Sequence, residues 1–136
     1  MREIVFRGKR IANGEWIEGY ITEHTMITHD MQSYIGWVIE CKKTELYEYN
    51  WYEVDPVTVG QYTGLKDKNG KRIFEGDIVT RILFDKLYQY EVAYQPGYAS
   101  FDGIRKGGFI SFGNDGDCFE VIGNIHDNPE LLGCVK

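Results

Sequence analysis

Apolar and polar side chains alternate along several short segments of this 136-residue chain, and no stretch of ten or more residues repeats apolar positions at helical spacing. A period of two is typical of β-strands, because successive side chains of a strand point to opposite faces. We therefore predict an all-β fold. The expected strands are Glu15–Thr22, Ile35–Ile39, Leu46–Val54, Asp77–Phe84, Tyr88–Tyr94, Tyr98–Phe101, Gly108–Phe112 and Cys118–Ile125, and the run Ile35–Ile39 is expected to be buried on both faces.

Glycine and Asx residues mark the turns, as at Asn69-Gly70 and Gln95-Pro96-Gly97, because they tolerate positive φ. The polar segment Glu23–Asp30 predicts a loop or hairpin tip. Two segments resemble helix starts, with an Asx residue able to cap and a proline in the first helical position: Asp55–Thr58 and Asn128–Leu132. Each is long enough for about one turn.

Several sequence elements recur in the same order in both halves of the chain. Residues 13–21 (N-G-E-W-I-E-G-Y-I) parallel residues 69–78 (N-G-K-R-I-F-E-G-D-I), which contain one added residue, and the segment 52–62 resembles 119–125. A unit of about 60 residues buries little surface alone. The repeat therefore predicts one domain, residues 1–136, built by internal duplication from two related small β-barrel or SH3-like subdomains, residues 1–65 and 66–136.

The charge balance argues against an extended nucleic-acid surface, because 15 basic and 21 acidic residues leave a net charge of −6. No apolar run approaches the roughly 18 residues of a membrane-spanning helix, and the first residues lack the apolar core of a signal peptide. Three widely spaced cysteines, Cys41, Cys118 and Cys134, favour reduced thiols over a disulfide framework. These features predict a cytosolic protein without a membrane partner.

Candidate catalytic and metal-binding groups are few. Glu75 and Asp77 flank a glycine and would share a face in a strand, as general acid/base chemistry could use, but we prefer a turn-capping role for them. The spacing of His24, His29 and Asp30 matches no metal motif, and Asp115 and Asp117 lack the spacing of a calcium loop. We therefore expect no enzymatic activity, no metal and no cofactor.

The aromatic residues, 15% of the chain, form two alternating stripes that are candidate binding or packing surfaces: Tyr47, Tyr49 and Trp51, and Tyr88, Tyr90 and Tyr94. Such stripes stack on single-stranded nucleic acid, line subunit interfaces or fill a core. We favour core and interface. A basic turn is the other candidate binding element, with Lys66, Lys68, Lys71 and Arg72.

The segment 54–79, V-D-P-V-T-V-G-Q-Y-T-G-L-K-D-K-N-G-K-R-I-F-E-G-D-I-V, resembles the hallmark of the YopX-like family of phage and prophage proteins. The start, R-E-I-V-F-R, and residues 120–132 also resemble it, whereas residues 26–46 match loosely. The family motif maps onto Gly60, Gln61, Tyr62, Thr63, Gly64, Asn69, Gly70, Glu75, Gly76 and Asp77. The resemblance implies an all-β fold, oligomerisation and a phage or prophage gene, but it implies no catalytic residue.

Together these observations predict a phage or prophage accessory protein that is a non-enzymatic, self-associating binding module. Its partner would be a second copy of the chain and a host or phage macromolecule. The alternative is a nucleic-acid-binding accessory protein with an SH3- or OB-like barrel that uses the Lys66–Arg72 turn.

Overall fold

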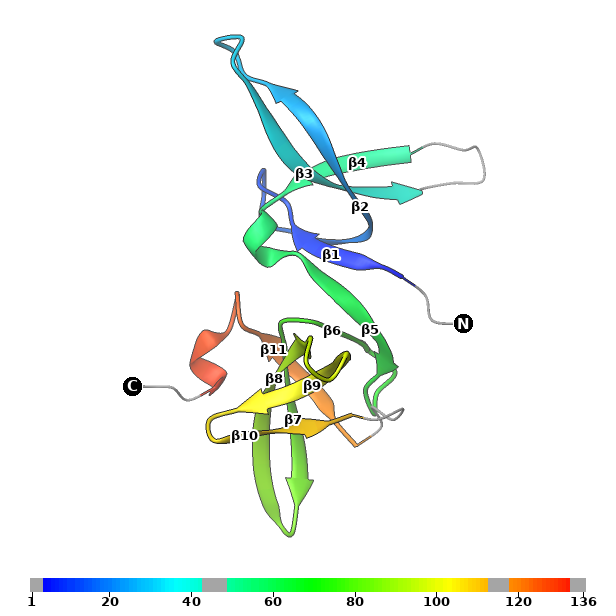
Figure 1. The fold of residues 1–136 in the computed structure, drawn as a ribbon, viewed down its shortest axis with the longest axis vertical. Coiled ribbons are helices and arrows are strands. Elements are labelled where there is room, and N and C mark those ends of the chain that lie inside the picture. Colours follow the sequence, from blue (N-terminus) through cyan, green and yellow to red (C-terminus); the bar gives the residue numbers. More distant parts are fainter. Residues whose placement is uncertain (1–3, 43–48, 113–117, 133–136) are drawn as a thin grey trace. The chain divides into compact units, whose positions relative to one another are not determined.

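The computed structural model describes residues 4–42, 49–112 and 118–132. These residues form antiparallel strands and two short 3-10 turns, so the all-β prediction is confirmed (Figure 1). They divide into two compact units, of which the first ends at Gln61 and the second begins at Tyr62. The division lies inside strand β5 (Gly60–Lys66), whereas the sequence placed it after residue 65.

The first unit is a sheet in the order β4-β3-β2-β1, and Arg10 after β1 bridges back to Val54 of β4. β1 also pairs through Phe6 and Arg7 with Gln61 and Gly60. Its elements are β1 (Phe6–Lys9), β2 (Trp16–Ile27), β3 (Ser33–Lys42), β4 (Tyr49–Val54) and the 3-10 turn η1 (Pro56–Thr58). The Asp55 side chain caps η1 by accepting a 3.1 Å hydrogen bond from the Val57 N–H. The predicted single turn after Asp55 is therefore confirmed.

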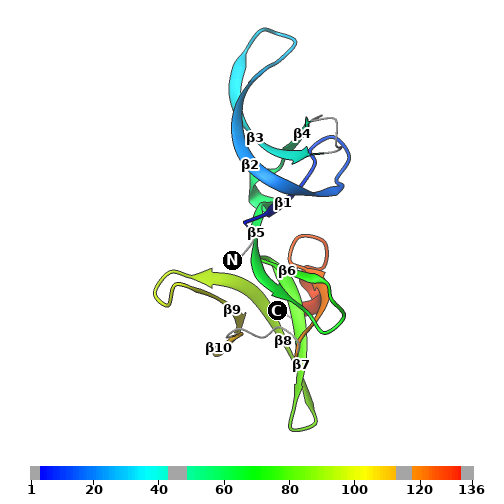
Figure 2. The same ribbon diagram turned by 90° about the vertical axis from the view of Figure 1, so that its right-hand side faces the viewer.

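Burial changes faces along the β2–β3 hairpin. Up to Ile21 the inward residues of β2 have odd numbers, and from Thr22 to Ile27 they have even numbers. In β3 the neighbours Val38 and Ile39 are both fully buried although they point to opposite faces. Figures 1 and 2 show the hairpin curving along its length, which brings a different face inward at each end.

The prediction that Ile35–Ile39 is buried on both faces is wrong at its beginning. Ile35 is 66% exposed and Trp37 is 39% exposed. Both lie opposite residues 23–25 of β2, where the odd-numbered side chains of the hairpin face solvent. A run of apolar residues therefore does not show by itself that both faces of a strand are covered.

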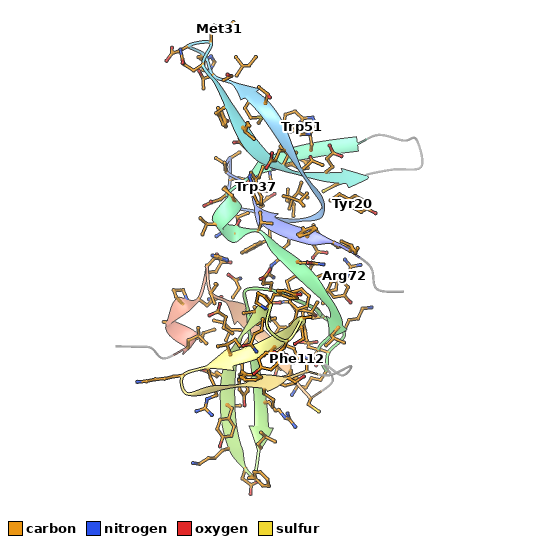
Figure 3. The ribbon with its side chains drawn as sticks, viewed as in Figure 1. Tyr20, Met31, Trp37, Trp51, Arg72 and Phe112 are labelled. Carbon is orange, nitrogen blue, oxygen red and sulfur yellow. The ribbon has the colours of Figure 1, made fainter. Side chains whose placement is uncertain are left out.

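The loop predicted for Glu23–Asp30 is also largely wrong, since residues 23–27 continue β2 and pair with Ser33–Trp37 of β3. Thr25 and Ile27 are β-branched and favour a strand. The turn is confined to Thr28–Gln32, where the Thr28 N–H donates to the Gln32 carbonyl at 2.9 Å. Met31, with φ of 62°, lies at the far end of the hairpin (Figure 3).

The second unit contains a sheet in the order β10-β9-β8-β7-β11, together with a hairpin of β5 and β6. Its further elements are β6 (Arg72–Phe74), β7 (Asp77–Leu83), β8 (Lys86–Gln95), β9 (Ser100–Arg105), β10 (Gly108–Ser111), β11 (Glu120–Asn124) and the 3-10 turn η2 (Pro129–Leu132), which confirms the predicted second short turn. The core is formed by Ile73, Val79, Tyr90, Val92, Phe112 and Phe119. The described strands of neither unit close a full barrel, so the β-barrel form predicted for the two subdomains is not confirmed.

Equivalent positions of the sequence repeat adopt similar turns. Gly14 and Gly70, the glycines of the two Asn-Gly pairs, have φ of 73° and 83°. The second copy differs after its added residue, where Glu75 and Gly76 (φ 93°) form a turn that separates β6 from β7, while β2 runs unbroken. These features fit a duplication, which stays a prediction. Among the described residues, no helix is long and apolar enough to cross a membrane.

The close pairing of β2 and β3 yields a stability prediction at Gly19. A Cβ atom there would overlap the Glu40 carbonyl oxygen, which is backbone and cannot move aside cheaply. We expect Gly19→Ala to lower the free energy of unfolding by about 1–3 kcal/mol, measured by urea denaturation. Gly97→Ala is the matched control, because a Cβ there meets nothing within 4 Å. Equal effects of the two substitutions would contradict this account of Gly19.

Candidate functional site

The four predicted basic residues lie on one hairpin, β5–β6. Lys66, Lys68 and Lys71 are exposed, while Arg72 is half-buried with its guanidinium 5.1 Å from the ring centroid of Tyr62 (Figure 3). Lys68 Nζ lies 3.4 Å from the carboxylate of Glu120 on β11. Two of the four cations thus already have partners within the second unit, and the hairpin is a weaker anion site than its sequence indicates.

A buried carboxylate that the sequence reasoning missed shapes this hairpin. Asp67 accepts hydrogen bonds from the N–H groups of Asn69 at 2.8 Å, Lys71 at 2.9 Å and Val121 at 3.0 Å. Burial alone would raise the pKa of Asp67, but these three donors and the Lys71 charge together hold it below its ordinary value of 3.8. Asp67 therefore closes the turn and attaches it to β11. An aspartate two residues before Asn-Gly was the available signal.

The residues of the family motif have mainly structural roles. Tyr62 is buried against Phe74, with ring centroids 5.5 Å apart. The Thr63 hydroxyl donates to the Ile73 carbonyl at 2.8 Å and accepts from the Leu65 N–H. Gly64, Gly70 and Gly76 have positive φ, and Gly60 and Gln61 pair with β1. Asn69 lies in the turn that Asp67 closes.

Of the two acidic motif residues, Asp77 makes the kind of turn-capping contact that the sequence favoured. Asp77 is buried and accepts a 2.7 Å hydrogen bond from the Phe74 N–H, which is a turn-capping contact. Burial raises the pKa of Glu91 on β8, and the nearby charge of Glu75 raises it further. The carboxylates that repel each other are therefore Glu75 and Glu91. Asp115 and Asp117 lie outside the described residues.

The two predicted aromatic stripes differ in burial. On β8, Tyr90 belongs to the core and Tyr88 lies 4.8 Å from the Arg105 guanidinium. Tyr94 is 44% exposed and makes an edge-to-face contact with Phe101. On β4, Trp51 is 49% exposed. Tyr47 and the Tyr49 side chain lie outside what the structure describes. The stripe on β4 therefore contributes an exposed ring, and the stripe on β8 contributes mainly to the core.

Trp51 belongs to a row of three residues across β2, β3 and β4, which we call the aromatic–acid row: Tyr20, Glu40 and Trp51. Glu40 pairs with Tyr20 on one side and Trp51 on the other, so all three side chains point to the same face. Tyr20 is 62% exposed. His24 Nε2 donates to Glu40 Oε1 at 3.3 Å, and its ring lies 5.2 Å from that of Trp51. Sequence reasoning missed this row because Tyr20 and Glu40 are 20 residues apart.

The same face carries a second acid–aromatic contact. The Tyr34 hydroxyl donates to both oxygens of Glu53 at 3.0 and 3.1 Å, and this hydrogen bond is the main cause of the raised pKa of Tyr34. Glu53 pairs with Val38, one row beyond Glu40. Carboxylates and aromatic rings thus adjoin each other over much of this face.

Histidines and cysteines do not gather in the described part of the chain, which contains no group of three or more His, Cys, Asp or Glu residues placed to hold a metal ion. The thiol of Cys41 donates to the Glu18 carbonyl at 3.1 Å, and Cys118 is a free, exposed thiol. Cys134 lies outside the described residues.

With the fold and these surfaces in view, comparisons with known proteins define the class of protein. The family model described as YopX protein matches residues 5–133. The chain therefore belongs to the YopX family, and the resemblance noted from the motif is confirmed. The phage or prophage origin stays a prediction.

A solved structure is similar over nearly the whole chain: protein EF1440 from Enterococcus faecalis. It is 28% identical with a TM-score of 0.56, and the match covers 98% of this chain and 100% of that one. The search of curated proteins found no match. The relative's description names no activity or ligand, so the function must be argued from the surfaces of the chain itself.

The hydrogen bonds that Asp67 accepts yield a prediction with a definite pH dependence. Asp67→Asn should lower the free energy of unfolding at pH 7 by about 2–3 kcal/mol, because three N–H groups lose a charged acceptor. Since the native pKa is depressed, the contribution of Asp67 is present above the ordinary value of 3.8 and is lost as the pH falls through the native pKa. Urea denaturation at several pH values should therefore show that the difference in free energy of unfolding between Asp67→Asn and wild type becomes smaller in acid. Asp30→Asn, at an exposed position, is the control.

The raised pKa of Glu91 predicts the opposite pH dependence of stability. Its native pKa is raised above the ordinary 4.5, so its stabilising contribution is present below 4.5 and is lost as the pH rises through the native pKa. Glu91→Gln should accordingly raise the thermal midpoint at pH 7 and leave it unchanged in acid, as followed by circular dichroism. The exposed Glu23→Gln serves as the control. A variant less stable than wild type at pH 7 would show that the Glu91 carboxylate is favourable in the fold.

Proposed function

We propose that this YopX-family protein is a non-enzymatic binding module that associates with a second copy of itself in the bacterial cytosol. The supporting observation is an exposed apolar surface on the β2–β3 hairpin, which we call the apolar stripe. It consists of Ile27, Ile35 and Trp37, with Met31 at the hairpin turn.

The apolar stripe is continuous on one face of the hairpin. Ile27 pairs with Ser33, Ile35 with Thr25 and Trp37 with Glu23, so all three large side chains point to the face opposite the aromatic–acid row. Diagonal neighbours in such a pair are within reach of long side chains. Glu23 supplies the only charge among these six paired residues.

A second copy is the occupant that this chemistry fits best. Burying one large apolar side chain contributes about 1.5–3 kcal/mol, so a contiguous exposed set favours association. The chain carries a net charge of −6, so two copies repel except where the contact is nearly uncharged, and the apolar stripe meets that condition. Two identical stripes related by a two-fold axis bury each other in a closed dimer.

The phage or prophage accessory role and a further host or phage partner belong to the same proposal, supported by membership of the YopX family. The nucleic-acid alternative has one supporting observation, the three exposed lysines of the β5–β6 hairpin. The ion pair of Lys68 with Glu120 and the stacking of Arg72 on Tyr62 weaken it.

Self-association can be tested by light scattering on the purified chain at micromolar concentration. We expect a dimer for wild type and a monomer for Ile35→Glu, because two charges would then be buried against each other. Ile82→Glu is the matched control, since Ile82 is 68% exposed and lies on β7 of the other unit. It should remain a dimer with the same thermal midpoint. A strictly monomeric wild-type protein would overturn the proposal.

A further inference from the structure

We propose that the aromatic–acid row of Tyr20, Glu40 and Trp51 binds an arginine side chain of a partner protein. This inference deepens the proposed function, on which it rests, by naming the chemistry of the further partner. It concerns the face of the sheet opposite the apolar stripe.

The geometry places a carboxylate between two exposed rings. Glu40 is the middle member of the row, and residues directly opposite each other in antiparallel strands have Cβ atoms about 4.5–5.5 Å apart. A planar cation above Glu40 is therefore within reach of both rings. His24 contacts both other groups and so fixes their positions: it donates to Glu40 Oε1 at 3.3 Å, and its ring packs against that of Trp51.

The residue types suit a guanidinium group. An aromatic ring attracts a cation over its face, and Trp does so most strongly. A guanidinium can stack on a ring and donate two hydrogen bonds to a carboxylate at once, whereas an ammonium is a compact, strongly hydrated charge. Arginine should accordingly bind better than lysine.

Elsewhere in the chain, arginines already stack on aromatic rings. The guanidinium carbons of Arg7, Arg10 and Arg105 lie 4.6, 4.3 and 4.8 Å from the centroids of Trp16, Tyr52 and Tyr88. By contrast, none of the described lysine or arginine side chains lies over Tyr20 or Trp51, and His24 contacts Trp51 from one side with a ring centroid distance of 5.2 Å. The row thus has the same chemistry as these internal contacts, but its rings face solvent.

Charge complementarity selects the class of partner. Glu18 and Glu53 project to the same face as Glu40, and the whole chain is acidic. The cations that β1 adds to this face, Arg7 and Lys9, lie over the Trp16 ring at 4.6 and 5.7 Å and not at the row. Such a surface repels nucleic-acid phosphates and attracts a basic polypeptide segment, and electrostatic attraction of this kind also speeds encounter. The partner is therefore a protein with an exposed arginine-containing segment.

The test is fluorescence anisotropy at physiological salt with a labelled peptide of alternating arginine and glycine. The matched probes contain lysine, or the uncharged arginine isostere citrulline, in place of arginine. We expect the arginine peptide to bind best and the citrulline peptide not to bind. Trp51→Ala and Glu40→Gln should each weaken binding by about five- to tenfold, the loss expected for one cation–π or charged contact.

Two controls separate a specific site from net charge. Glu23→Gln removes one exposed charge from the opposite face, and Tyr98→Ala removes an exposed aromatic ring from the second unit, outside both proposed surfaces. Both should bind the peptide as wild type does. Thermal midpoints establish that the variants fold, and the isosteric Glu40→Gln decides the matter if Trp51→Ala is unstable.

Equal binding of the arginine and citrulline peptides, or equal losses in Glu40→Gln and Glu23→Gln, would overturn the inference. Single-stranded DNA bound through Trp51 would also overturn it, in favour of base stacking. Failure here leaves self-association untouched, because light scattering reports on the apolar stripe and anisotropy on the aromatic–acid row. A monomeric wild-type protein that binds the arginine peptide through Trp51 would refute the dimer alone.

Discussion

The exposed surfaces of the first unit depend on one constraint: β2 and β3 pair with each other well past the ends of the strands on either side of them. These two strands have 12 and 10 residues, whereas β1 has 4 and β4 has 6. Where all four strands run together, Ile39 and Val54 are fully buried. Beyond that point the hairpin continues with few neighbours, and its apolar side chains face solvent because the core no longer reaches them.

In the second unit the β7–β8 hairpin likewise extends past its neighbouring strands (Figure 2). Ile82 and Leu87 form an exposed cross-strand pair, and Phe84 in the turn is 97% exposed. Phe84 and Asp85 both have positive φ, a conformation that costs a non-glycine residue about 1–2 kcal/mol. Met31 ends the other long hairpin in the same backbone region. Each unit therefore presents an apolar residue at the end of its longest hairpin.

Buried carboxylates stabilise turns in this protein. Asp67 and Asp77 accept backbone N–H groups, and Asp102 accepts from the Gln95 amide at 2.6 Å and from the Ser100 hydroxyl. A buried carboxylate is tolerated when several donors surround it. The preference for capping over catalysis at Asp77 agrees with this pattern, whereas Asp67 and Asp102 received no role from the sequence.

The amino-acid sequence by itself determined the features that depend on neighbouring residues: the all-β class, the capped turn after Asp55, the turn before Leu132 and the tight turn at Asn69-Gly70. Their physical causes act within a few residues, so a single segment shows them. The family, too, was evident in one continuous motif.

Only the tertiary structure decided which side of each strand is covered. Tyr90 and Trp51 lie in similar alternating stripes, yet one is buried in the core and the other faces solvent. Likewise, the inward face of β2 changes between Ile21 and Thr22 with no break in the strand. Burial depends on what residues distant in sequence bring against a face. For that reason the partners of Glu40 on two neighbouring strands, and with them the aromatic–acid row, could not be foreseen from local pattern.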